Sequence, residues 1–169
     1  MEEVLNREEV VQDDVLPDEL RTIIRKGWYF TPAGAFVLEA LEPRSMLAKT
    51  FLTKHFRRNR ELASHWGGVA DYEYHTNDVK IPESGLPSDK ERFLSAVAIR
   101  ALCFIEEAFR SAARFEVSNG LTAVVSVGVG DNYLSHGTTV KFFTRRAGRP
   151  DWYEDLERFK IEAIAVLTR

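Results

Sequence analysis

Ser88-Asp89-Lys90-Glu91 opens the stretch that decides the fold, SDKERFLSAVAIRALCFIEEAFRSAARFEVSNG, which runs from residue 88 to residue 120. Ser88 with Glu91 three positions later matches a capping box, in which each side chain bonds the other residue's backbone N–H at a helix start. Asn119-Gly120 suits a helix end. Apolar residues recur between them at alternating spacings of four and three, on one helix face: Leu94, Ala98, Ala101, Ile105, Ala108, Ala112 and Phe115. The pattern predicts one helix of about thirty residues, covered from two sides.

The composition is that of one soluble globular domain. Of the 169 residues, 44% are apolar and 29% are charged, which is typical of a packed core and not of a disordered chain. No apolar run approaches the roughly eighteen residues of a membrane span, and the acidic start is unlike a secretory signal. The single cysteine, Cys103, cannot form an intramolecular disulfide, which fits a reducing compartment. We therefore expect a cytoplasmic protein in which Cys103 is a buried structural thiol.

The chain before the long helix contains weaker signals. A short helix is predicted from Pro17 to Lys26 with Gly27 as its C-terminal cap, followed by extended Trp28-Tyr29-Phe30. Residues 31–41 favour another short helix, with a strand over Phe36-Val37-Leu38 as the alternative. A longer helix is predicted from Ser45 to about Trp66. Residues 69–87 are predicted to form mainly a loop with a short edge strand over 69–75, and long loops often carry binding surfaces.

The clearest β signals follow the long helix. Residues 121–129 and 138–146 are rich in β-branched residues and alternate in part, which predicts an antiparallel hairpin with a glycine-rich loop over 130–137. The end of the chain fits either a helix after Asp151 or a third strand over Ile161–Leu167, and both readings stay open. The fold class is therefore α+β. It is a single domain over residues 1–169, with a long central helix and flanking helices packed on a small antiparallel sheet (hairpin 121–146), and with residues 1–15 as a loosely attached acidic arm.

Charge is segregated along the chain. Residues 1–19 carry eight acidic side chains against one basic, whereas residues 44–60 carry six basic side chains and no acid. The basic run interleaves cations with phenylalanines, which can contact phosphates by charge and bases by stacking. The nucleic-acid-binding candidates are Lys49, Lys54, Arg57, Arg58 and Arg60. The alternative is that the acidic arm masks this run, or that the arm itself docks a basic protein.

The 130–137 loop holds the candidates for catalysis. His136 suits general acid–base work because its ordinary pKa is near neutrality, and Asp131, Asp71 or Glu73 would orient it. The ordinary explanation of this loop is turn chemistry, with polar residues and glycines where the backbone requires them. The four histidines show no metal-ligand spacing, so we expect no metal and no cofactor.

Protein binding is the function that the sequence favours. No catalytic constellation is visible, and aromatic side chains in predicted loops beside segregated charge suit an electrostatically steered interface. The predicted partner-binding residues are Glu8, Glu9, Asp13, Asp14, Tyr72, Tyr74 and Tyr133. Bacterial immunity proteins, which neutralise a toxin by covering it, have this general size and composition. The alternatives are a nucleic-acid-binding protein that uses residues 44–60 and an enzyme with a site at the 130–137 loop.

Overall fold

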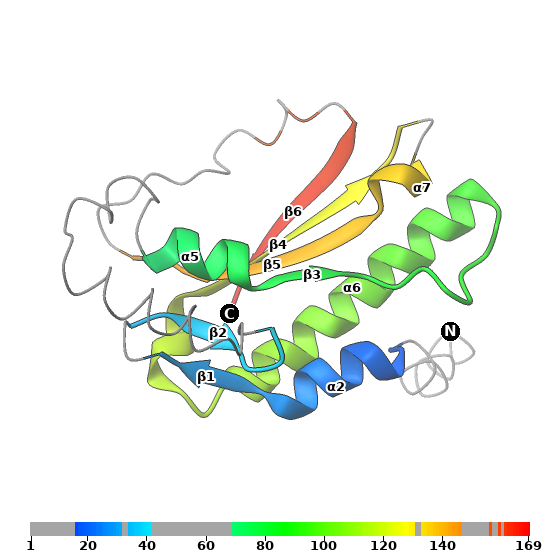
Figure 1. Cartoon of the computed structure of the whole chain (residues 1–169). Coiled ribbons are helices and arrows are strands. Elements are labelled where there is room, and N and C mark those ends of the chain that lie inside the picture. The colour runs from blue at the N-terminus through cyan, green and yellow to red at the C-terminus, as the bar shows by residue number, and fades with distance from the viewer. Residues whose placement is uncertain are drawn as a thin grey trace, which may run out of the picture.

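The computed structural model describes residues 16–31, 34–41, 69–130, 133–146, 156, 159 and 161–169. Its helices are α2 (Asp18–Lys26), α5 (Val69–Thr76), α6 (Lys90–Ala112) and α7 (Tyr133–His136), with a 3-10 turn over Glu116–Gly120. Its strands are β1 (Trp28–Phe30), β2 (Phe36–Leu38), β3 (Asp78–Lys80), β4 (Leu121–Gly128), β5 (Thr138–Thr144) and β6 (Glu162–Thr168). Helices thus pack with small antiparallel sheets, which confirms the predicted α+β class (Figure 1). None of the helices in these ranges is long and apolar enough to cross a membrane.

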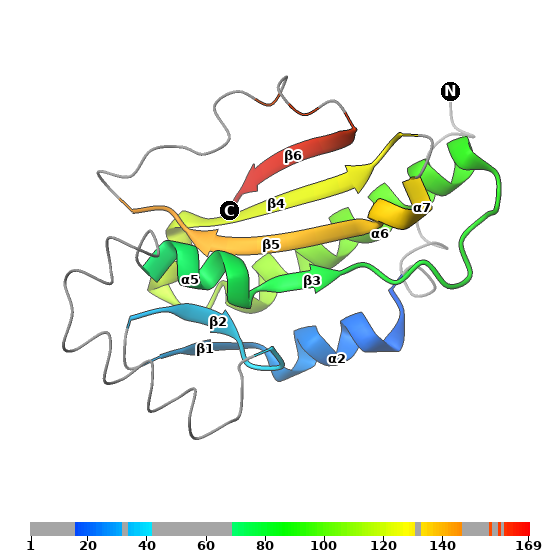
Figure 2. The ribbon, with the colours of Figure 1, turned by 45° about the horizontal axis from the view of Figure 1, so that its top comes forward.

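The described strands form two antiparallel sheets. Strands β1 and β2 make a two-stranded ribbon, and the larger sheet has the order β3-β5-β4-β6. The predicted hairpin over 121–146 is confirmed, since β4 and β5 pair from Leu121 with Thr144 to Val127 with Thr138. Figure 2 shows the four strands side by side with α6 behind them, with α5 in line with β3 alongside β5, and with β2 next to α5.

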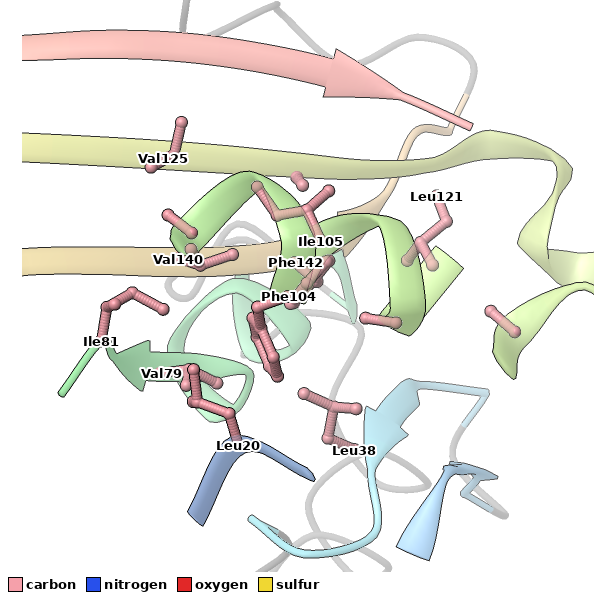
Figure 3. Packing of buried hydrophobic residues seen from close by; sticks show 14 of the residues in the cluster. Leu20, Leu38, Val79, Ile81, Phe104, Ile105, Leu121, Val125, Val140 and Phe142 are labelled. Carbon is pink, nitrogen blue, oxygen red and sulfur yellow. The ribbon is translucent and has the colours of Figure 1, made fainter. Parts of the chain in front are cut away.

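Helix α6 forms the core with one face of the larger sheet. Phe104 and Ile105 lie against Val140 and Phe142 of β5 (Figure 3), and the ring centres of Phe104 and Phe142 are 6.0 Å apart. The predicted apolar stripe is confirmed. Its predicted start is wrong by one residue, because Asp89 and not Ser88 is the N-cap, and the Asp89 carboxylate accepts the Arg92 N–H at 3.1 Å. The helix also ends earlier than predicted, at Ala112.

The N-terminal ribbon joins this core through Trp28. Its indole N–H donates to the Ala108 carbonyl at 3.0 Å, and its ring stacks on Phe36 at 4.7 Å.

The predicted helix over Pro17–Lys26 is confirmed as α2, which Gly27 ends at a positive φ of 76°. The helix favoured for 31–41 is wrong, because a turn at Gly34 (φ 85°) returns the chain as β2, where Phe36, Val37 and Leu38 are all buried.

The edge strand predicted over 69–75 is also wrong, because these residues form α5 and the strand β3 comes after it. Helix α5 has almost no amphipathic pattern. Its buried side chains include the carboxylate of Glu73, and the fully buried Asn77 is the first residue after the helix. Buried polar contacts, together with the apolar packing of Ala70 and Tyr74, therefore hold α5 in place, and the polar contacts leave no hydrophobic period in the sequence.

Glu73 and Asn77 connect the two sheets, and we call this pair the α5 clasp. The Glu73 carboxylate accepts the backbone N–H of Phe36 in β2 at 2.7 Å and that of Thr144 in β5 at 2.7 Å. The Asn77 side chain accepts the N–H of Leu38 at 2.8 Å and donates to the carbonyls of Phe36 at 3.0 Å and Phe142 at 3.2 Å. The side chains of α5 thus make the hydrogen bonds that a strand between β2 and β5 would otherwise make.

The end of the chain settles one open alternative. Residues 162–168 form β6, which pairs antiparallel with β4 from Thr168 with Thr122 to Glu162 with Gly128. The strand reading of 161–167 is confirmed and the helix reading is wrong there. The predicted helix over 45–66, the acidic arm over 1–15 and the cap at Asp151 lie outside the described residues.

Replacing Glu73 with glutamine tests the clasp. The amide has one oxygen, so it cannot accept every bond that the carboxylate accepts, and a buried donor loses its partner. We expect Glu73→Gln to lower the free energy of unfolding by about 3 kcal/mol in urea. The matched control is Glu116→Gln, an exposed position where the change is expected to stay within about 0.5 kcal/mol. Equal stability of the two variants would contradict the role of the clasp.

Candidate functional site

His136 lies on α7, the short helix at the end of β4, and its side chain is exposed. No hydrogen bond or ion pair connects it to another described residue, and its predicted partner Asp131 lies outside them. The Glu73 carboxylate accepts a hydrogen bond from Thr144 at the last residue of β5, whereas His136 lies just before Thr138, its first residue. The two thus lie at opposite ends of β5, about 20 Å apart at ~3.3 Å per residue. Asp71 is near His75 instead, at 3.7 Å. The structure therefore does not bring His136 together with Glu73 or Asp71.

Glu73 is the most buried ionisable side chain of the described residues, and hydrogen-bond donors occupy all acceptor sites of its carboxylate. Besides the two backbone N–H groups, it receives both terminal nitrogens of Arg146, at 2.7 and 3.0 Å. A carboxylate has about four acceptor sites, and donors fill all of them here. This arrangement fixes structure and leaves no lone pair for proton abstraction.

The three predicted partner-binding tyrosines pack on their own fold. Tyr74 lies edge-on to Phe143 at 6.1 Å, with the Lys141 ammonium 4.8 Å from its ring centre. Tyr133 meets Phe93 of the core at 5.2 Å. Tyr72 is half-buried as well. The large apolar side chains that the described residues do expose are Phe30, Ile99, Leu102, Leu134 and Ile161.

The strongly charged candidates fall mostly outside the described residues. These are the acids Glu8, Glu9, Asp13 and Asp14 and the basic residues Lys49, Lys54, Arg57, Arg58 and Arg60, and both roles stay predictions. Two of the described cations near the C-terminus have acidic partners. Lys141 pairs with Asp78 at 3.0 Å, and Arg146 pairs with Glu73. These two charges stabilise the fold instead of forming an open basic surface.

Cys103 is half-buried on α6. Burial raises the pKa of its thiol, and the negative charges of Glu106 and Glu107 raise it further. The thiolate is the reactive form of cysteine, so this environment disfavours nucleophilic chemistry. Within the placed parts of the chain, no group of three or more His, Cys, Asp and Glu side chains converges as metal ligands would.

The outer side of β6 is a row of backbone groups with no described strand beside it. The Arg169 N–H donates to the Leu121 carbonyl, and the Val129 N–H donates to the Ile161 carbonyl. Antiparallel pairing alternates, so odd-numbered residues from 161 to 169 direct their N–H and C=O groups at β4. The even-numbered residues direct theirs away from the sheet: Glu162, Ile164, Val166 and Thr168. No hydrogen bond connects these outward groups to another described residue.

The β6 strand itself is neither short nor charged at its centre. Proteins protect edge strands by making them short or by placing charges on them. Strands β1 and β3 have three residues each, and β3 carries Asp78 and Lys80. In contrast, β6 has seven residues and no charge or proline from Ala163 to Leu167. We call the outward backbone groups of β6, together with its exposed Ala163 and Ala165, the β6 edge.

The β6 edge carries exposed alanines on the sheet face that α6 covers, and α6 itself exposes Leu102. Ala163 and Ala165 pair with Val127 and Val125, so they share the sheet face that α6 covers, yet both alanines are exposed. On α6, Arg100 bonds the carbonyls of Pro82 and Ser84 beyond β3, the opposite edge of the sheet. Leu102 is two residues, or about 200°, further round the helix, so it points away from the side on which Arg100 lies, and it is 44% exposed.

Comparison of the chain with protein-family models, with curated proteins and with solved structures finds no significant match. The site is therefore defined by geometry alone, and the β6 edge is its strongest feature.

The pH dependence of Cys103 alkylation tests the raised pKa of its thiol. The raised pKa predicts that the rate constant with iodoacetamide reaches half its maximum above about pH 8.5, the ordinary thiol value. The thiol form is favoured in the folded state, so this group's contribution to stability is present below that pH and is lost as pH rises through the raised pKa. Glu106→Gln removes one negative charge and is expected to lower the midpoint, whereas Glu91→Gln on the same helix leaves it unchanged. A wild-type midpoint below about pH 8.5 would contradict this environment.

Proposed function

We propose that this protein is a protein-binding module that receives an extended strand of its partner at the β6 edge. The observation that carries the proposal is the long strand β6, whose outward N–H and C=O groups bond no other described residue and whose centre has no charge. A partner strand would satisfy these groups with main-chain hydrogen bonds, as in strand addition to a sheet edge.

The side chains around the edge suit a protein partner. Ile164 and Val166 face the outer side of the sheet in a small apolar cluster with Val124 and Phe143. Ala163 and Ala165 face the side of the sheet that α6 covers, and both are exposed. An added strand would therefore meet apolar surface on both faces, and its alternate side chains would supply specificity.

The two alternative functions rest on other residues. Nucleic-acid binding depends on the run from Lys49 to Arg60, outside the described residues, while Lys141 and Arg146 already have acidic partners. An enzyme at the 130–137 loop depends on Asp131, also outside them, and on an exposed His136. An inhibitor or immunity-type role is one form that a strand-adding module can take, and it rests on size and composition.

A proline at position 166 tests strand addition. The Val166 N–H points outward, so Val166→Pro removes one docking donor without removing a β4–β6 hydrogen bond, and proline is tolerated at such edge positions. The matched control is Val166→Thr, which keeps both the N–H and the β-branched shape. A third variant, Ala165→Pro, removes an N–H that bonds β4 and is expected to destabilise the fold, which verifies the register.

The measurement is quantitative capture of bound macromolecules from the native source by wild type, Val166→Pro and Val166→Thr, with thermal unfolding to confirm folding. We expect Val166→Pro to lose about tenfold or more of a specific captured protein, because one main-chain bond and the partner's register are lost. Val166→Thr should retain that protein. Equal capture by the proline variant contradicts the proposal. Capture of nucleic acid that weakens steeply with salt would instead favour the basic run.

A further inference from the structure

We infer that the strand received at the β6 edge is β6 of a second copy of this chain, so that the protein associates as a two-fold symmetric dimer. The inference rests on the proposed function and names its partner. Its basis is that the β6 edge is complementary to itself in one particular register.

Hydrogen bonding selects that register. A two-fold axis perpendicular to the sheet at Ala165 places Glu162 opposite Thr168 and Ile164 opposite Val166 of the second copy. All four residues direct their N–H and C=O groups outward, so each opposed pair exchanges two hydrogen bonds. A shift of the axis by one residue leaves at least one of the four without an opposite β6 residue. The register at Ala165 therefore pairs every outward backbone group.

The side chains agree with this register. On the outer face, Ile164 meets Val166 of the second copy, a pair of β-branched residues that packs well across strands. On the inner face, the small Ala163 meets the larger Leu167, and Ala165 meets its own copy at the axis. No like charges are opposed, because the charged Glu162 faces Thr168.

The helices leave room for the pairing. Helix α6 crosses β4 and β5, so the two copies of α6 would lie about four strand spacings apart, or roughly 19 Å. Packed helices need only about 8–10 Å, so the helices do not collide. The contact is then mainly a strand pair about 23 Å long, at ~3.3 Å per residue. Such a contact falls at or below the low end of specific interfaces, about 1,200 Å² in total, so we expect a weak, concentration-dependent dimer.

Cysteine cross-linking distinguishes this register from random contact. In a Cys103→Ser background, Ala165→Cys puts the new thiol on the axis, opposite its own copy in a non-hydrogen-bonded pair. The Cα atoms of such a pair are about 4.5 Å apart, within disulfide range. Ala163→Cys is the matched control, an exposed alanine on the same face of the same strand. Its two copies would lie about 13 Å apart along the strands, which is too far for a disulfide.

The experiment uses the full chain under mild oxidation, analysed on non-reducing gels, with sedimentation velocity over a broad range of concentration for the Cys103→Ser protein. We expect Ala165→Cys to cross-link about tenfold faster than Ala163→Cys, and Val166→Pro added to Ala165→Cys to abolish the difference. Equal rates for the two cysteine variants overturn the register. A monomer at every concentration, with no cross-linking at position 165, overturns the second copy as partner. In that case the proposed function stands only if capture of another protein is still lost in Val166→Pro, so the two failures are distinguishable.

Discussion

The buried carboxylate of Glu73 is the constraint on which the arrangement of this fold depends. It lies at the point where β2, β5 and α5 meet, and it accepts hydrogen bonds from both strands and from Arg146. An unpaired carboxylate in such a place is strongly disfavoured, so the position of α5 and the approach of the ribbon are coupled to this one group. Asn77 extends the connection by bonding the next backbone groups of β2 and β5.

This clasp closes one side of the β structure, whereas no described element closes the other side. At the β5 side, α5 supplies polar side chains where a further strand would lie, and the short β3 occupies the rest of that edge. At the β6 side, none of the described elements does the same. The two edges therefore differ. The fold satisfies the outward backbone groups at the β5 edge, and we propose that a partner strand satisfies those at the β6 edge.

Sequence reasoning recovered the parts of the fold that depend on local pattern. The spacing from Leu94 to Ala112 predicted α6, and the β-branched runs predicted β4 and β5. It offered β2 only as the alternative to a favoured helix, and it missed α5, because these elements depend on Glu73 and Arg146, which are far apart in the sequence and follow no spacing rule. Likewise, alternation made a strand over 161–167 plausible, but only the topology shows that this strand is an edge. The packing of Tyr133 against Phe93 and of Tyr74 against Phe143 also depends on contacts between segments far apart in the sequence, which no local pattern reveals.

Strand β6 bonds β4 on one side, and we propose that its other side receives a partner. Residue-resolved amide hydrogen exchange in dilute protein measures this directly. The amides of Ala163, Ala165 and Leu167 should be protected, whereas those of Ile164 and Val166 should exchange rapidly and become protected as protein concentration rises. Uniform protection of all five amides at high dilution would contradict the claim, because it would mean that the outer side of β6 is already bonded within a single chain.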